Sequence, residues 1–167
     1  GISPLAQPVI TVPGNQLTTE GAPLAFSPSS GRQIHVVAPG LGAGPLRLVI
    51  SALHSLGQVT PILSFGTTTG LTVTGNGANV FHLQGSLSNI NAALASLTFY
   101  TPDNGDFTID LLATDPATGE NDVASIDVFA SNVSPQVSFP NNESGDEGSV
   151  IANTIELSDP GAFDNPQ

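Results

Sequence analysis

Hydrophobic and polar residues alternate along three stretches of this chain, 46–52, 107–111 and 124–130. Successive side chains of an extended strand point to opposite faces, so this alternation is typical of strands with one buried side. The residues predicted to face a core are Leu46, Leu48, Ile50, Ala52, Phe107, Ile109, Leu111, Ala124, Ile126, Val128 and Ala130.

A hairpin is predicted where the sequence GNGAN (75–79) separates LTVT from VFHLQ. Glycine and asparagine tolerate the positive φ angles that short hairpin loops require. The two flanking segments are therefore expected to pair as antiparallel strands.

One segment departs from the strand period. In SLSNINAALASL (86–97) the apolar residues Leu87, Ile90, Leu94 and Leu97 recur at helical spacing. We predict a short helix at about Ser88–Ala95, lying over an open end of the sandwich, with Ser86 or Ser88 as its N-cap.

Composition favours a turn-rich all-β domain. Hydrophobic residues make up 39% of the 167 residues, too many for a disordered tract, while the chain contains 18 Gly and 14 Pro. We predict a Greek-key β-sandwich at 1–134, because this length holds one domain and a remainder. Residues 135–167 are expected to be a strand-like extension, either the incomplete start of a second β-sandwich repeat or a strand-donating tail. The opening GIS lacks a translation start, so a processed or excised piece is expected.

The charge balance excludes several partners. Fourteen Asp and Glu residues against two Arg give a net charge of −12, which argues against nucleic acid, since binding it requires clustered cations. With neither Cys nor Lys in the chain, disulfides, thiolate metal sites and lysine isopeptide crosslinks cannot form. No apolar run approaches the roughly 18 residues of a membrane span, so no membrane insertion is expected in this segment.

The segments QPVITVPGNQLTTEGAPLAFS and LTVTGNGANVFHLQGSLSNINAALASLTFYTPDNGDFTIDLLATD resemble the cadherin-like, immunoglobulin-like repeats of very large bacterial surface proteins and adhesins. The resemblance covers about 8–135, and SLSNINAALASLTFYTP looks like that family's signature. The following VSFPNNESGDEGSVIANTIELSDPGAFDN is similar to the first strands of a further β-sandwich repeat. The resemblance implies an extracellular module on a bacterial cell surface.

The same resemblance implies calcium at the junction between two domains. The residues at matching places are Glu20, Asp115, Asn132, Glu147, Asp159 and Asp164. The linker ASNVSPQV has Ser131 and Ser134 where that family often has Asp. Because calcium affinity rises with the number of carboxylate ligands, weak, near-millimolar binding is expected, and solvated loop acids are an equally good interpretation.

No catalytic site is predicted. His35, His54 and His82 stand far apart and outside any recognisable catalytic motif. A glycan-binding platform is also disfavoured, because the chain has no Trp and one Tyr, Tyr100. The phenylalanines that lie in or beside strand patterns are expected to be packing residues; they include Phe26, Phe65, Phe81, Phe107 and Phe129.

Two N-glycosylation sequons, at Asn132 and Asn142, flank the linker, and chance occurrence in an Asn- and Ser-rich chain is the somewhat favoured explanation. The sequence favours a non-enzymatic spacer or adhesive repeat of a secreted bacterial surface protein, contacting neighbouring repeats or copies of itself. One alternative is a subunit of an extracellular filament or surface layer, joined by β-strand exchange through the tail. A third is a module that binds glycans or a cell-surface or matrix receptor.

Overall fold

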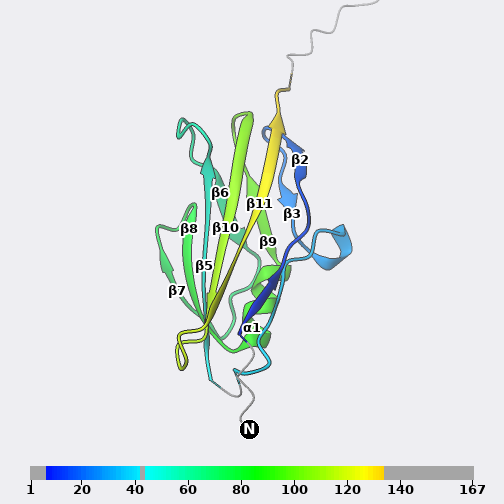
Figure 1. The fold of residues 1–167 in the computed structure, drawn as a ribbon. Helices are drawn as coiled ribbons and strands as arrows, with labels where there is room; N and C mark the ends of the chain where they lie inside the picture. Colours follow the sequence, from blue (N-terminus) through cyan, green and yellow to red (C-terminus); the bar gives the residue numbers. More distant parts are fainter. Residues whose placement is uncertain (1–6, 42–43, 134–167) are drawn as a thin grey trace, which may run out of the picture. The chain divides into compact units, whose positions relative to one another are not determined.

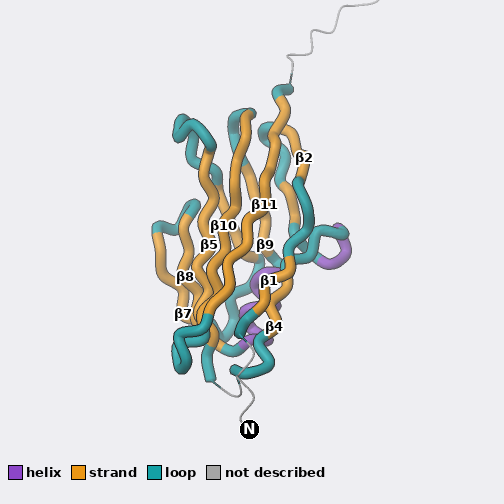
Figure 2. The backbone as a smooth tube through the Cα atoms, in the orientation of Figure 1, coloured by secondary structure: helices purple, strands orange, loops and turns teal. Residues whose placement is uncertain are grey.

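The computed structural model describes residues 7–41 and 44–133. These residues form an all-β sandwich of two strand layers with one short α-helix, as the alternation predicts (Figures 1 and 2). The extension predicted at 135–167 lies outside the described residues.

The larger layer is a six-stranded sheet. At its centre β10 (Gly105–Thr114) pairs antiparallel with β11 (Asn121–Ser131) on one side and with β5 (Leu46–His54) on the other. Its full order is β2 (Gln16–Thr19), β11, β10, β5, β8 (Val80–Gly85) and β7 (Thr72–Gly75). Only β2 runs parallel to its neighbour, β11, among the strand pairs that the described residues form.

The opposing layer consists of two smaller sheets. One has the order β3 (Leu24–Ala25), β9 (Leu97–Tyr100) and β6 (Ile62–Phe65). The other pairs β1 (Val9–Thr11) with β4 (His35–Val37), and a 3-10 turn, Pro28–Ser30, precedes β4. The chain crosses between the layers from β5 to β6, β6 to β7, β8 to β9 and β9 to β10, which gives the predicted Greek-key type of connection.

The core lies between the layers and contains the residues that the alternation assigned to it. Ala124 is half-buried and packs against the core, and the other predicted inward residues are buried. Three phenylalanines, Phe26, Phe99 and Phe107, are among the largest fully buried side chains. Phe99 and Phe107 meet edge to face, with 5.4 Å between ring centroids, a favourable aromatic geometry.

The predicted helix is present as α1 (Leu87–Ala95), one residue longer than expected at its start. Of the two candidate caps, Ser86 is the one used, because its Oγ accepts a hydrogen bond from the Asn89 N–H at 3.2 Å. Ile90, Ala93 and Leu94 are buried, and the helix packs against β4 and β8.

The predicted hairpin is also confirmed: β7 and β8 pair antiparallel on either side of the 76–79 loop. The Asn76 side chain organises this loop, since its Oδ1 accepts hydrogen bonds from the N–H groups of Ala78, Asn79 and Val80. Asparagine therefore serves here both for its tolerance of turn conformations and as a local acceptor.

Side chains close both edges of the β1–β4 pair. Asn91 of α1 accepts a hydrogen bond from the Val36 N–H and donates one to the Val36 carbonyl, each at 2.9 Å. On the other edge, the Ile10 N–H donates to Asp122 Oδ2 at 2.8 Å. These bonds satisfy backbone groups that a further strand would otherwise have to pair.

The domain has two poles. We call the end that holds Gln7 and the 115–120 turn the N-terminal pole, and the end that holds Glu20 and Val133 the C-terminal pole. Strand β11 connects them, beginning at Asn121 beside the first and ending at Ser131 beside the second (Figure 1). Eleven strand residues span about 35 Å.

Candidate interaction surface

The structure separates the described members of the predicted calcium set. Glu20 and Asn132 lie at the C-terminal pole, where the Glu20 N–H donates to the Ser131 carbonyl at 3.0 Å. Asp115 lies in the turn between β10 and β11, at the N-terminal pole. Because β11 separates the two ends, one ion cannot contact all three residues. Glu147, Asp159 and Asp164 lie outside the described residues.

At the C-terminal pole, Glu20 is held by neighbours from another loop. Its Oε1 accepts a hydrogen bond from Asn104 Nδ2 at 3.2 Å, and the next N–H, of Gly21, donates to the Thr101 carbonyl at 2.8 Å. Asn132 is exposed directly after β11, which a glycosylation acceptor also requires; the second sequon, Asn142, lies outside the described residues.

Asp115 is engaged in a turn. Its side chain is 5% exposed, and its Oδ1 accepts a hydrogen bond from the Ala117 N–H at 3.0 Å. Its own N–H donates to the Glu120 carbonyl at 2.8 Å. The bond from the Ala117 N–H is typical of an Asx turn, and such a turn places an aspartate here without requiring a metal ion.

Within residues 7–41 and 44–133, no three His, Asp or Glu side chains gather closely enough to hold a metal ion. Calcium requires six to eight oxygen ligands, and of the predicted set the described residues at the C-terminal pole are Glu20, with its carboxylate, and Asn132, with its amide. They do not complete a calcium site by themselves.

The histidines have structural or solvent-facing places. His54 Nδ1 accepts hydrogen bonds from the N–H groups of Leu56 and Gln58, at 3.2 and 3.3 Å, and its ring meets Phe107 at 5.0 Å. His82 is exposed on β8, as its alternation with Phe81 and Leu83 predicts. The ring of His54 thus organises the turn that follows β5.

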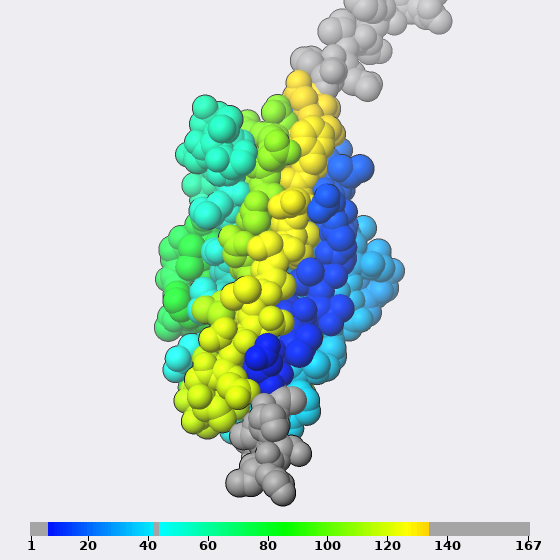
Figure 3. Space-filling model, in the orientation of Figure 1, coloured from blue at the N-terminus to red at the C-terminus, as the bar shows by residue number. Residues whose placement is uncertain are grey.

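The side of the six-stranded sheet away from the core, here called the outer face, carries several exposed apolar side chains among polar ones. The residues in cross-strand register form rows: Val123, Leu112 and Val49 in one; Ser125, Asp110 and Ser51 in the next; Asp127, Thr108 and Leu53 in the third; Phe129 and Asp106 in the last. Leu17 of β2 is in register with Phe129. Figure 3 shows β11 running along this face between β10 and the N-terminal segment.

Several of these side chains are strongly exposed. Leu17 is 77% exposed, Val123 68%, Leu53 54% and Phe129 46%. Phe129 was expected to be a packing residue, and that expectation is wrong, because its neighbours Val128 and Ala130 fill the inward positions of β11. The sequence already indicated this, because Phe129 is two and four residues from Asp127 and Ser125 and so lies on the same, outward side of the strand.

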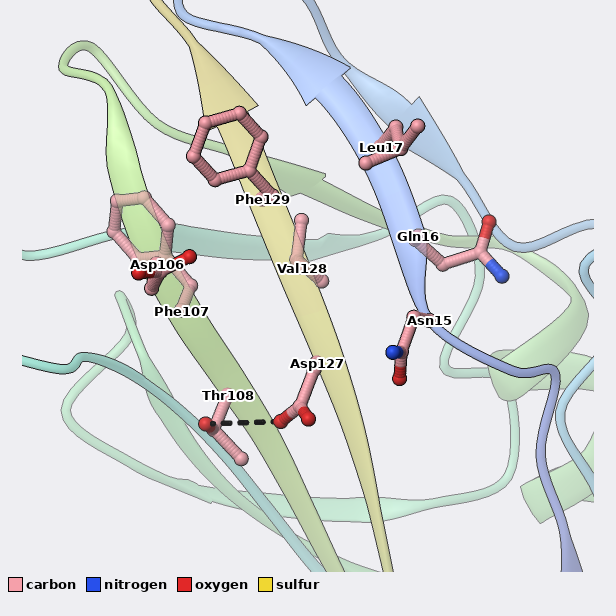
Figure 4. Close-up of a pocket in the computed structure, with 9 residues that line it drawn as sticks. All are labelled: Asn15, Gln16, Leu17, Asp106, Phe107, Thr108, Asp127, Val128 and Phe129. Carbon is pink, nitrogen blue, oxygen red and sulfur yellow. Dashed lines mark hydrogen bonds between the residues drawn. The ribbon is translucent and has the colours of Figure 1, made fainter.

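A hollow of about 390 Å³ lies on this face where β2 meets β11 and β10 (Figure 4). Leu17 and Phe129 stand toward one end of it, and Asp127 and Asn15 toward the other. Asp127 Oδ1 accepts one hydrogen bond, from Thr108 Oγ1 at 3.4 Å. A carboxylate has about four acceptor positions, so it retains capacity for a further donor.

A second hollow, of about 400 Å³, lies further along the same strands. It combines Asp110 with the apolar residues Val49, Leu112 and Val123. Asp110 Oδ1 accepts a hydrogen bond from Ser125 Oγ at 2.6 Å. Both hollows therefore place a carboxylate beside exposed apolar side chains.

Comparison with known proteins does not assign this chain to a family. No protein-family model and no curated protein matches the chain, so the cadherin-like resemblance stays a prediction. Among solved structures, a cohesin module from a family 33 glycoside hydrolase of Clostridium perfringens ATCC13124 is similar over 78% of this chain and 100% of its own, with 11% identity and a TM-score of 0.39. A similarity this weak says nothing about function.

The described residues include no helix of the length and apolarity that crossing a membrane would require.

Proposed function

We propose that this chain is a non-enzymatic spacer module from the multidomain array of a secreted bacterial surface protein, and that it transmits tension between its neighbours. The supporting observation is the parallel pairing of β2 with β11, which are the first and the last strands of the six-stranded sheet in chain order and are neighbours within it. The described part of the chain begins at the N-terminal pole and ends at the C-terminal pole (Figure 1).

This topology determines how a pulling force acts. A force that draws Gln7 and Val133 apart pulls β2 and β11 in opposite directions along their common axis. The backbone hydrogen bonds between 16–19 and 128–131 are then loaded together in shear, so several must break at once. In an unzipping geometry the same bonds would break one after another, at lower force.

Side-chain bonds reinforce the pair at both ends. The Ile10 N–H bond to Asp122 ties the segment before β2 to the start of β11. Near the other end, Ser131 Oγ donates to the Thr18 carbonyl at 3.3 Å. A domain held in this way resists extension, which is the property that a spacer under load requires.

Calcium enters this proposal as a stiffener of two separate junctions. In a tandem array the N-terminal pole, with Asp115, would face the preceding repeat, and the C-terminal pole, with Glu20 and Asn132, would face the following one. Any ion at the second junction would need further oxygens from 134–167, where Glu147, Asp159 and Asp164 stand. We expect calcium in the millimolar range to raise the melting temperature if these residues bind it, and magnesium not to.

Force spectroscopy tests the tension-bearing role directly. The natural sequence has no Cys, so the pair Gln7→Cys and Val133→Cys gives two specific handles. The pair Ala22→Cys and Val133→Cys places both handles at the C-terminal pole and unzips the same β2–β11 bonds. We expect the first pair to unfold at the higher force; equal or lower force would contradict the proposal.

A second candidate is a filament subunit assembled by strand exchange. The observation in its favour is the position of β7 at the end of the sheet order, with all four residues exposed, because an open edge can accept a further strand. Truncation after Pro135 should then abolish self-association in a sizing experiment. A chain that remains monomeric with the tail present would exclude this candidate.

A further inference from the structure

We propose that the outer face of the six-stranded sheet is a docking surface for a different protein, one that presents arginine or lysine side chains among apolar ones. This goes beyond a spacer role, because it assigns the domain a partner other than its neighbours in the array. The first argument is exposure. Exposed apolar side chains form two groups on one side of the sheet, Leu17 with Phe129 at one end and Val123 with Leu112 at the other. Grouped apolar side chains on a solvated face mark interaction sites.

Charge defines the partner. Three carboxylates on the face are exposed: Asp110 and Asp127 lie between the Val123 and Phe129 rows, and Asp106 is in register with Phe129. Of the two arginines in the chain, Arg32 donates its Nε–H to the Ala25 carbonyl in the opposite layer. Arg47 lies one row beyond Val49, in register with Thr114. The centre of the face is therefore acidic and complements a cationic surface.

The same charges disfavour the two occupants that this chain could itself supply. Residues 134–167 contain acidic residues and no Lys or Arg, so the chain's own tail would bring like charge to the face. A second copy would carry its own net charge of −12. Like charges facing one another across an interface are unfavourable, which leaves a heterologous basic partner.

The hollows suit long cationic side chains. An arginine or lysine side chain has an apolar stem and a charged head. In the first hollow the stem would lie against Leu17 and Phe129 and the head would reach Asp127. In the second it would lie against Leu112 and Val123, with Asp110 as the acceptor.

Spacing adds a geometric requirement. The hollows centre near 128 and 124 of β11, four residues apart, which corresponds to about 13 Å along a strand. A partner strand repeats its side chains on one face every two residues, so cationic residues four apart would reach both hollows. A model peptide, acetyl-LSRSLSRSL-amide, here called the leucine–arginine peptide, places two arginines four residues apart on one face of a strand, with leucines between and beside them and serines on the other face.

The test is an NMR titration of the full chain with this peptide at 150 mM NaCl, alongside calorimetry for affinity. Two reference peptides separate the contributions: the serine–arginine peptide acetyl-SSRSSSRSS-amide keeps the charge without apolar side chains, and the leucine–glutamate peptide acetyl-LSESLSESL-amide reverses the charge. We expect saturable binding of the leucine–arginine peptide, with amide shifts confined to β2, β10, β11 and β5. The serine–arginine peptide should bind at least tenfold more weakly.

Variants locate the site. Asp127→Asn and Asp110→Asn should each weaken binding by up to about fivefold, the range for one exposed ion pair. Phe129→Ser should weaken it by about tenfold, as for an apolar anchor. Asp103→Asn removes the same charge from an exposed loop at the C-terminal pole and should leave affinity unchanged. Circular dichroism melts verify that each variant is folded.

Three results would overturn the proposal. Equal affinity for the leucine–arginine and serine–arginine peptides would mean that general attraction to an acidic protein explains the binding. Equal effects of Asp103→Asn and Asp127→Asn would mean that the face has no special role. Absence of saturable binding, or tight binding of the leucine–glutamate peptide, would contradict the charge argument.

Discussion

The two faces of the six-stranded sheet use apolar residues for different purposes. On β11, Ile126, Val128 and Ala130 point inward and are at most 1% exposed, whereas Val123 and Phe129 point outward and are 68% and 46% exposed. The inward residues bury area and stabilise the fold. The outward residues leave much of their area in water, so folding gains little from them. Alternation explains the first set, and the proposed docking surface would account for the second.

The largest expected effect comes from the inner face. Ile109→Ala removes a fully buried side chain at the centre of the sheet and should lower the free energy of unfolding by about 2 to 5 kcal/mol, because lost burial and a residual cavity add. Urea denaturation measures this. A loss below about 1 kcal/mol would mean that the core can collapse around the vacancy.

A smaller effect should follow from the carboxylate that closes the β1 edge. Asp122→Ala leaves the Ile10 N–H without its side-chain acceptor and should cost about 1 to 3 kcal/mol. Asp122→Asn retains an acceptor oxygen and should cost less in the same urea experiment. Equal losses for both variants would show that charge, and not the hydrogen bond, holds β1 to β11.

The outer face should tolerate substitution. Phe129→Ser replaces a half-exposed side chain on β11 and should change the free energy of unfolding by about 1 kcal/mol or less, well below the cost of a buried phenylalanine. Thermal melts of the two proteins suffice to measure it. A loss of several kcal/mol would show that Phe129 packs in the free chain and would end the distinction between the faces.

Salt should produce the smallest change. With a net charge of −12, the folded chain repels itself, and ions screen this repulsion. Raising NaCl from 20 to 200 mM should increase the melting temperature by a few degrees at most. A decrease would indicate that attractive ion pairs outweigh the repulsion.

Much of the sandwich could be predicted from the sequence, because its strands bury one side only. The alternation in 46–52 and 107–111 identified inward residues, and the GNGAN loop identified the β7–β8 hairpin. The helix was predictable from the spacing of Leu87, Ile90 and Leu94, although two serines competed as its cap. In each of these cases the prediction depended on residues close together in the sequence.

Long-range relations were not predictable in the same way. Nothing local in the sequence indicates that Asp122 accepts from Ile10, 112 residues away, or that Asn91 closes the edge of β4. The grouping of Asp115 with Glu20 came from a resemblance, and the path of β11 places the two at opposite poles. Both hollows likewise depend on strand order, since their residues come from segments that only the sheet brings together.

The most direct test compares one substitution on the two faces of one strand. Val128 is 1% exposed and Val123 is 68% exposed, so Val128→Ala and Val123→Ala remove the same atoms from opposite sides of β11. We expect Val128→Ala to lower the free energy of unfolding by about 1.5 to 3 kcal/mol and Val123→Ala by about 0.5 kcal/mol or less. Equal losses would mean that the outer face is already covered in the isolated chain, and its assignment as a free docking surface would be wrong.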